Sequence, residues 1–246
     1  TVYEEITRKD TTNGKQVFYD VTGPEVTPSY TETTTEQDEE FTNYPTFDVK
    51  DNSNQTVTEE LISGAVDTTT IGSYKLTYRF TDVVGNYTDV TVTVKVVDTK
   101  APTISGITDG AYYNTIDTHA IPSAYDKNGA VMFIRTELGD LKLTSFLKNE
   151  KEIKIVGTYK VWAVDKFGNK SDEITIHIDP YAPKVLVLDR VENVSGAYLP
   201  IKPVILEHNL DTIEVTLNGK KIDFKEGDQL TKDGKYVMTV TDKAKN

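Results

Sequence analysis

The chain has 246 residues, and its 27 basic and 39 acidic side chains give a net charge of −12 at pH 7. This negative charge repels the phosphates of nucleic acids and anionic membrane surfaces, so the composition argues against both as partners. No stretch approaches the roughly 20 apolar residues that span a bilayer, no signal peptide is visible, and there is no cysteine for a disulfide or a zinc site. We expect a soluble piece of a longer protein, without membrane insertion.

The first 20 residues are predicted to be the end of an upstream module. Val17 and Tyr19 stand at alternate positions, as in a half-buried strand. Residues 10–14, Asp-Thr-Thr-Asn-Gly, have the residue types of a tight turn. We therefore assign residues 1–20 to a remnant C-terminal hairpin.

A long strand and its partner are predicted next. Aromatic and aliphatic side chains alternate with polar ones over residues 74–81, which indicates a half-buried antiparallel strand, and its partner is predicted over residues 87–97. Gly85 and Asn86 suit the positive-φ positions of the turn between them. Asp82 is placed to accept backbone N–H bonds in that turn.

The same unit recurs twice more along the chain. Each copy has a glycine two residues before a tyrosine, an alternating strand, and an aspartate that begins a polar turn; the copies are Tyr74 with Asp82, Tyr159 with Asp165, and Tyr236 with Asp242. The second copy predicts strands over residues 159–164 and 173–178, and the third contains an Asn-Gly hairpin signal at 218–219. Such self-similarity is typical of tandem β modules.

An acidic residue followed by proline marks each junction between modules. The prolines are Pro24, Pro102 and Pro183, so they are 78 and 81 residues apart, which is the size of a small sandwich domain. Proline cannot donate to a strand ladder and therefore ends one sheet before the next begins. We predict a first module over residues 21–100, a middle module over 101–181, and a third module over 182–246 that lacks its last strand.

The first closing hairpin resembles a known family. Residues 67–78, Asp-Thr-Thr-Thr-Ile-Gly-Ser-Tyr-Lys-Leu-Thr-Tyr, followed by Asp-Val-Val-Gly-Asn at 82–86, closely resemble the group-3 bacterial immunoglobulin-like (Ig-like) domain of Gram-positive surface proteins. The resemblance covers the first module, and the other two are similar to related Ig-like modules of the same proteins. It implies an all-β fold of tandem Ig-like β-sandwich modules arranged end to end.

The resemblance also implies a non-catalytic role, because such domains carry no catalytic residues. The motifs agree with it. The three histidines, His119, His177 and His208, are far apart in sequence, and there is no His-Glu-x-x-His helix, Gly-x-Ser-x-Gly elbow or Walker loop. We predict that the chain is not an enzyme and has no catalytic residue.

The carboxylates allow two interpretations. Asp98 and Asp179 at the junctions, and the acidic run at 36–40, supply oxygen ligands of the kind that calcium prefers. The alternative is a solvated acidic surface, since no Asp-x-Asp-x-Asp-Gly loop is present. No other cofactor is expected. An architectural role, in which each carboxylate caps its own turn, is favoured at Asp82, Asp165 and Asp242.

The aromatic residues divide into core and candidate ligand positions. Tyr74, Tyr159 and Tyr236 resemble the tyrosine corner of sandwich domains, with a buried ring and a hydroxyl bonded to the backbone. Trp162 alternates with the inward positions of its strand, so it points outward and is a candidate for stacking on a sugar or contacting a protein. The alternative is that a loop covers this face of the sheet.

Two functions follow from these observations. The first is a structural and adhesive stalk of an extracellular protein at the surface or cell wall of a Gram-positive bacterium. Its partners are the neighbouring modules of the same polypeptide and a host or matrix protein or a glycan. The second is a set of accessory modules on a secreted carbohydrate-active enzyme or protease, which bind glycan through Trp162.

Overall fold

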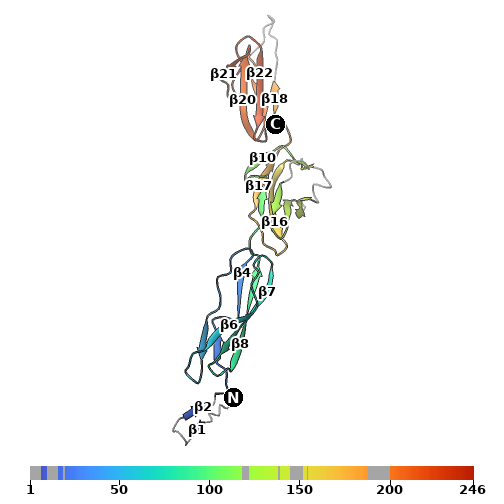
Figure 1. Cartoon of the computed structure of the whole chain (residues 1–246). Helices are drawn as coiled ribbons and strands as arrows, with labels where there is room; N and C mark the ends of the chain where they lie inside the picture. The colour runs from blue at the N-terminus through green and yellow to red at the C-terminus, as the bar shows by residue number, and fades with distance from the viewer. Residues whose placement is uncertain are drawn as a thin grey trace. The chain divides into compact units, whose positions relative to one another are not determined.

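The computed structural model describes residues 7–9, 16–18, 20–117, 122–137, 139–144, 152–153, 155–187 and 200–246. Strands and connecting turns make up the fold, so the all-β prediction is confirmed (Figure 1). Two compact units, Thr1–Thr99 and Lys100–Asn246, divide the chain, and each is described by itself. In the described part of the chain, no helix is long and apolar enough to cross a bilayer.

Unit 1 begins with a short hairpin. β1 (Thr7–Lys9) pairs with β2 (Gln16–Phe18) in an antiparallel register. The predicted turn at 10–14 and Tyr19 lie outside the described residues. That this hairpin belongs to an upstream module stays a prediction.

The rest of unit 1 is a sandwich of two sheets. The larger sheet has the order β4-β8-β7-β6 and consists of β4 (Glu32–Glu36), β6 (Thr58–Ser63), β7 (Gly72–Thr81) and β8 (Tyr87–Val97), with β4 parallel to β8 (Figure 1). The smaller sheet pairs β3 (Glu25–Pro28) with β5 (Phe47–Lys50). Phe47 of the smaller sheet lies 4.8 Å from Phe80 of the larger, ring centroid to ring centroid. The core therefore lies between the two sheets.

Alternation along β7 and β8 builds this core. Thr81 pairs with Tyr87 across the closing turn, and the antiparallel register continues to Gly72 and Val96. Every second side chain is buried over residues 76–80 and 92–96, and the buried members are Leu76, Tyr78, Phe80, Val92, Val94 and Val96. The strands predicted at 74–81 and 87–97 are confirmed, because one sheet face packs on the core and the other meets solvent.

Unit 2 begins with a five-stranded sheet of order β10-β17-β16-β13-β14. Its members are β10 (Ala111–Tyr113), β13 (Ala130–Thr136), β14 (Gly139–Lys142), β16 (Gly157–Asp165) and β17 (Ile174–Ile178), and β10 runs parallel to β17. Short pairs flank the sheet, and they are β9 (Thr103–Ser105) with β12 (Ser123–Tyr125) and β11 (Ile116–Asp117) with β15 (Glu152–Ile153). Ile134, Val161 and Ile176 lie in the core of this part.

The remainder of unit 2 contains two further sheets. β18 (Lys184–Val187) pairs with β19 (Pro203–Leu206), and β21 (Lys220–Ile222), β20 (Leu210–Leu217) and β22 (Tyr236–Asp242) form a sheet in the order β21-β20-β22. Asn218 and Gly219 have φ angles of 50° and 80°, so the Asn-Gly hairpin prediction is confirmed. The predicted boundary at 100/101 lies one residue from the division between units, whereas the boundary at 181/182 lies inside unit 2.

Candidate functional site

The closing turn of the first module is held by one buried carboxylate. Asp82 is 6% exposed, and its Oδ1 accepts backbone N–H bonds from Val84, Gly85 and Asn86 at 2.9, 2.7 and 2.9 Å. Its Oδ2 accepts a bond of 2.8 Å from Nδ2 of Asn86. Gly85 has a φ of 99°, which glycine adopts without a steric penalty. The turn-capping prediction for Asp82 is confirmed.

The middle module repeats this geometry at Asp165. Its Oδ1 accepts N–H bonds from Phe167 and Asn169 at 2.8 and 2.9 Å, and its Oδ2 accepts a bond of 2.7 Å from Nδ2 of Asn169. Burial acts to raise the pKa of the carboxyl groups of Asp82 and Asp165, but the hydrogen bonds from their turns outweigh burial and hold both pKa values below the ordinary value. Both groups are therefore held as anions.

The third turn keeps the two bonds from its asparagine, with a different residue at the glycine position. Asp242 is fully buried, and its Oδ1 and Oδ2 accept bonds of 2.9 and 3.0 Å from N and Nδ2 of Asn246. Lys245 takes the place of the turn glycine and adopts a φ of 68°, which is strained for a residue with a side chain. The capping prediction for Asp242 is confirmed, and the bonds from the turn asparagine persist despite the departure at Lys245.

The turn asparagine acts differently from the sequence prediction. Asn86 is not among the positive-φ residues of the described chain, so its predicted conformation is wrong. Its side-chain amide bonds to Asp82 and also to the backbone oxygen of Asp20 at 3.2 Å. Asn246 likewise bonds to Asp242 and to the backbone oxygen of Asp179 at 2.6 Å. The asparagine that recurs at the end of the motif was the sequence feature that could have predicted these bonds to the preceding segment.

The three tyrosines share the predicted hydroxyl bond. Each donates to the backbone oxygen four residues upstream, and the distances are 2.7 Å at Tyr74, 3.0 Å at Tyr159 and 2.9 Å at Tyr236. The three rings differ in burial: Tyr159 is 8% exposed, whereas Tyr74 and Tyr236 are half-buried. The core position is confirmed at Tyr159 and is only partial at the other two.

Trp162 is not the exposed residue that its strand position predicted. It is 5% exposed and stacks on Phe133 with the ring centroids 5.8 Å apart. The guanidinium of Arg135 lies 5.0 Å and the ammonium of Lys170 lies 4.7 Å from the indole centroid. These side chains cover the ring through cation–π contacts, so the face of the sheet is closed by basic side chains from β13 and from the connection between β16 and β17.

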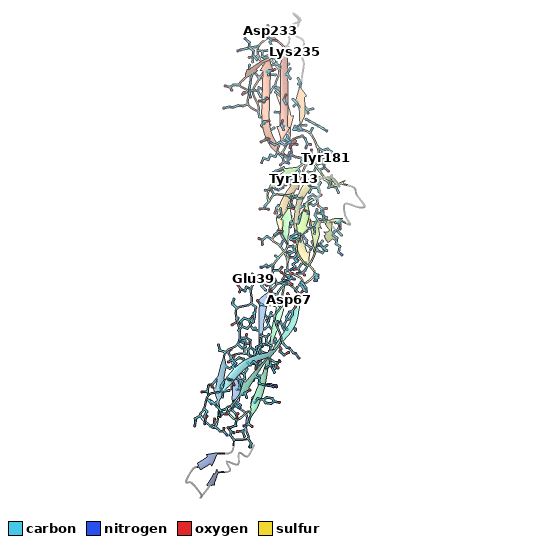
Figure 2. The ribbon with its side chains drawn as sticks, viewed as in Figure 1. Glu39, Asp67, Tyr113, Tyr181, Asp233 and Lys235 are labelled. Carbon is cyan, nitrogen blue, oxygen red and sulfur yellow. The ribbon has the colours of Figure 1, made fainter. Side chains whose placement is uncertain are left out.

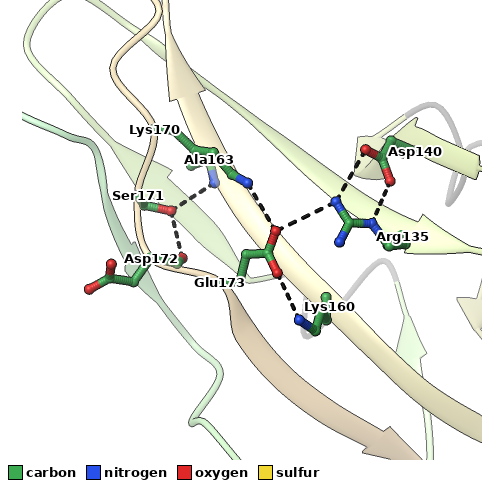
Figure 3. A network of polar contacts seen from close by, with 8 residues as sticks. All are labelled: Arg135, Asp140, Lys160, Ala163, Lys170, Ser171, Asp172 and Glu173. Carbon is green, nitrogen blue, oxygen red and sulfur yellow. Dashed lines mark hydrogen bonds and ion pairs between the residues drawn. The ribbon is translucent and has the colours of Figure 1, made fainter.

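Glu173 ties these basic side chains together (Figure 3). Its carboxylate lies 2.9 Å from Nζ of Lys170, 3.0 Å from Nζ of Lys160 and 3.5 Å from Nη2 of Arg135. Arg135 also pairs with Asp140 at 2.9 Å. The hydrogen bond from Lys170, followed by that from Lys160, lowers the pKa of Glu173 to about 2. The network holds the cover of Trp162 in place.

The comparisons with known proteins identify one part of the chain. Residues 29–96 match the family described as "Bacterial surface protein, Ig-like domain". The match lies within the first module and includes β4, β5, β6 and β7, the Asp82 turn and most of β8. Residues 29–96 are a bacterial surface Ig-like domain. No curated protein sequence matches the chain.

Three solved structures align with the chain at low identity. A lipoprotein from Bacteroides thetaiotaomicron is 17% identical with a TM-score of 0.25, over 74% of this chain and 93% of its own. The human desmocollin-1 ectodomain is 14% identical with a TM-score of 0.24, over 89% and 58%. The protein SGBP-B of a Bacteroides ovatus mixed-linkage glucan utilization locus, solved with a heptasaccharide, is 14% identical with a TM-score of 0.22, over 92% and 66%. At these TM-scores the alignments support no inference about this chain.

The two predicted calcium ligands at the junctions, Asp98 and Asp179, lie at strand ends. Asp98 follows β8 of the Ig-like domain and is half-buried. Asp179 follows β17, is 7% exposed, and its Oδ2 accepts a bond of 3.0 Å from Nδ2 of Asn209. Tyr113 packs against the middle core, and its hydroxyl accepts a bond of 2.9 Å from the N–H of Thr108 (Figure 2). Calcium binding at Asp98 or Asp179 stays a prediction.

The histidines form no site within the described residues. His177 stacks on Tyr112 with the ring centroids 4.4 Å apart, and its Nδ1 lies 2.9 Å from Oγ1 of Thr158. His208 is on the connection before β20, and His119 lies outside the described residues. Among the described residues, the geometry thus consists of structural turns and a covered tryptophan rather than a set of reactive groups.

Proposed function

We propose that the chain is a non-catalytic structural and adhesive stalk region of an exported protein, displayed at the surface or cell wall of a Gram-positive bacterium. The observation that carries the proposal is the match of residues 29–96 to the Ig-like domain of bacterial surface proteins. The repetition of the closing turn in all three modules extends the same construction along the chain.

The use of the buried carboxylates supports a structural role. Asp82, Asp165 and Asp242 each accept hydrogen bonds on both oxygens from their own turns. A general acid or base needs a carboxylate that reaches a substrate proton and has a pKa near the working pH. The lowered pKa values of Asp82 and Asp165 favour a permanent anion that stabilises a turn.

The competing function is a set of accessory modules that bind glycan, and the residue proposed to contact the glycan is covered. It depended on an exposed Trp162, and the ring is covered by Arg135 and Lys170. A covered indole cannot stack on a sugar unless both basic side chains leave it. We therefore favour a host or matrix protein as the adhesive partner, beside the neighbouring modules of the same polypeptide.

Two measurements test the proposal. Antibodies raised against the purified chain should label intact cells of the bacterium that makes it, and external protease should remove the label. Labelling that requires permeabilised cells would overturn the surface location. For adhesion, the purified chain is passed over immobilised matrix proteins and, separately, over polysaccharides. Retention on a matrix protein supports the proposal, and retention on polysaccharide alone supports the accessory modules instead.

A further inference from the structure

Three carboxylates meet at one end of the first module. Asp20 precedes β3, Asp51 follows β5, and Asp82 follows β7. The antiparallel pair Glu25 with Lys50 brings the start of β3 beside the end of β5. One carboxylate oxygen from each aspartate lies within 4.8 Å of the other two. Segments that are far apart in sequence thus place three acidic groups together.

Each carboxylate has one oxygen that shapes its own loop. Oδ1 of Asp20 accepts bonds from N and Oγ1 of Thr22, both at 3.1 Å, and from Nδ2 of Asn52 at 3.2 Å. Oδ1 of Asp51 accepts a bond of 3.0 Å from N of Ser53 and a further bond from the hydroxyl of that serine. Asp82 is bonded by its turn. The local hydrogen bonds therefore satisfy Oδ1 of Asp20 and Oδ1 of Asp51. They leave Oδ2 of each residue without a donor.

The second oxygens of Asp20 and Asp51 are buried and have no partner. Both Oδ2 atoms are sealed from solvent without any hydrogen-bond donor, and they are the only such side-chain atoms in the described part of the chain. A buried carboxylate oxygen without a donor costs free energy, and three like charges at this separation repel one another. Hydrogen bonds rather than a basic neighbour lower the pKa of Asp82. Among the described residues, no basic side chain forms an ion pair with these three carboxylates.

We propose that Asp20, Asp51 and Asp82 form a calcium-binding site in the first module. A divalent cation supplies the missing partner for both buried Oδ2 atoms and neutralises the repulsion. All three candidate metal ligands are carboxylates, and the cluster contains neither imidazole nor thiolate. This ligand set disfavours zinc and other metals that select nitrogen or sulfur. Calcium accepts six to eight oxygens in flexible geometry, whereas magnesium demands a near-ideal octahedron and retains its water.

A related cluster in unit 2 sharpens the assignment. Asp179, Glu207 and Asp242 also bring one oxygen each within 4.8 Å of the others. There, however, Asn209 donates a hydrogen bond to Oδ2 of Asp179. Among the described residues, no buried carboxylate oxygen of this second cluster lacks a hydrogen-bond partner. In the sequence, Asp126 and Asp165 of the middle module, and Asp98 ahead of it, occupy the matching positions. The proposal is made for the first module, because the unpartnered oxygens occur there.

Calcium titration of the whole chain tests the site. After treatment with EDTA, binding is measured by isothermal titration calorimetry, and hydrogen exchange is followed in the peptide that contains Val84, Gly85 and Asn86. Calcium-binding modules of extracellular proteins dissociate at about 0.1–1 mM, so the titration extends to about 10 mM. We expect calcium to slow exchange in this peptide and Asp51→Asn to weaken binding at this site by at least about tenfold, since one charged ligand is lost.

Matched variants keep ligand loss apart from misfolding. Asp48→Asn removes the same charge three residues away, from a side chain that is 68% exposed, and should bind calcium as the wild type does. Asp51→Asn retains an oxygen for the Ser53 bonds, so in EDTA it should melt at or above the wild-type temperature. If it melts lower, Asp20→Asn is tested in the same way. Equal calcium affinity in the wild type and both ligand variants, equal protection by magnesium, or no protection up to the end of the titration would overturn the proposal.

Discussion

The middle and third modules close with the same turn but differ in what lies beneath it. In the middle module the strand that leads into the turn buries Tyr159, Val161 and Ala163, and the last two are fully buried. In the third module Tyr236 and Met238 at the corresponding end of β22 are only half-buried. The tyrosine hydroxyl bond and the capping aspartate are present in both. Local turn chemistry is therefore independent of the amount of core beneath it.

The difference shows which interactions carry stability in each module. A turn of four or five residues satisfies its own backbone groups and needs no neighbouring sheet. Core packing depends on facing strands, and its contribution grows with the apolar area removed from water. We expect core substitutions to lower the free energy of unfolding much more in the middle module than in the third. Substitutions in the turns should lower it by similar amounts in both.

The largest effect is expected for the buried tyrosine. Tyr159→Ala should lower the free energy of unfolding of the middle module by about 3–5 kcal/mol, because a large buried ring is lost. Tyr236→Ala should cost about 1–2 kcal/mol, since the half-buried ring removes less area from water. Trp162 is the only tryptophan, so its fluorescence in urea reports on the middle module. Hydrogen exchange in β22 reports on the third.

The hydroxyl provides the control for this comparison. Tyr159→Phe keeps the ring and removes only the bond to the oxygen of Ile155, which is worth about 1 kcal/mol. Equal losses for Tyr159→Ala and Tyr236→Ala would contradict the proposed difference between the two cores.

Next in size is the capping carboxylate. Asp165→Ala leaves the N–H groups of Phe167 and Asn169 without their acceptor, and we expect a loss of about 1–3 kcal/mol in the middle module. Asp172→Ala, at an exposed aspartate nearby, should change stability by less than about 0.5 kcal/mol. Urea unfolding followed by Trp162 fluorescence measures both. Similar losses for the two variants would show that charge, rather than the cap, is responsible.

A smaller effect is expected at the residue that replaces glycine in the third turn. Lys245 adopts a φ of 68°, whereas Gly168 occupies the matching position at 91°. Lys245→Gly should be more stable than Lys245→Ala by about 1 kcal/mol, because both variants lose the exposed ion pair with Asp211 and only glycine relieves the left-handed conformation. Calorimetric melting of the chain measures the difference. A more stable alanine variant would mean that the turn does not hold this conformation in solution.

The parts of the fold that the sequence predicted are local. Alternation over 74–81 and the turn residues between Asp82 and Asn86 specify a hairpin, since side-chain period and turn geometry act over a few residues. The parallel pairing of β4 with β8 joins Glu32 to Thr93, and no short-range pattern indicates a partner so far along the chain.

The candidate site divides in the same way. The capping role of Asp82 follows from its own turn, but its position beside Asp20 and Asp51 depends on how β3, β5 and β7 end together. Trp162 shows the same limit. Its place in the strand sets which face it occupies, whereas its cover comes from Arg135 and Lys170 on other segments. Contacts between distant segments were therefore the part that the sequence could not supply.

The smallest effect is a pH dependence that distinguishes the network in the middle module from a single pair in the third. Glu173 has three basic neighbours, and its pKa is lowered from 4.5 to about 2. Glu214 in the third module has its pKa lowered by the hydrogen bond from Lys221 alone, and both side chains of that pair are exposed. We expect the network to contribute the larger pH-dependent stability.

The lowered pKa of Glu173 sets the pH window. Because the folded state favours the charged form, the contribution is fully present above pH 4.5 and is lost as pH falls from 4.5 to about 2. The urea midpoints of the wild type and Glu173→Gln, followed by Trp162 fluorescence, should differ most at pH 6 and converge near pH 2. Titration of Asp165 affects both proteins and cancels in the difference. Glu214→Gln, followed by hydrogen exchange in β20, should show a smaller change over the same window. A difference between the wild type and Glu173→Gln that stays constant from pH 6 to pH 2 would mean that the ion pairs with Lys170 and Lys160 do not form in solution, and that stacking on Phe133 alone keeps Trp162 covered.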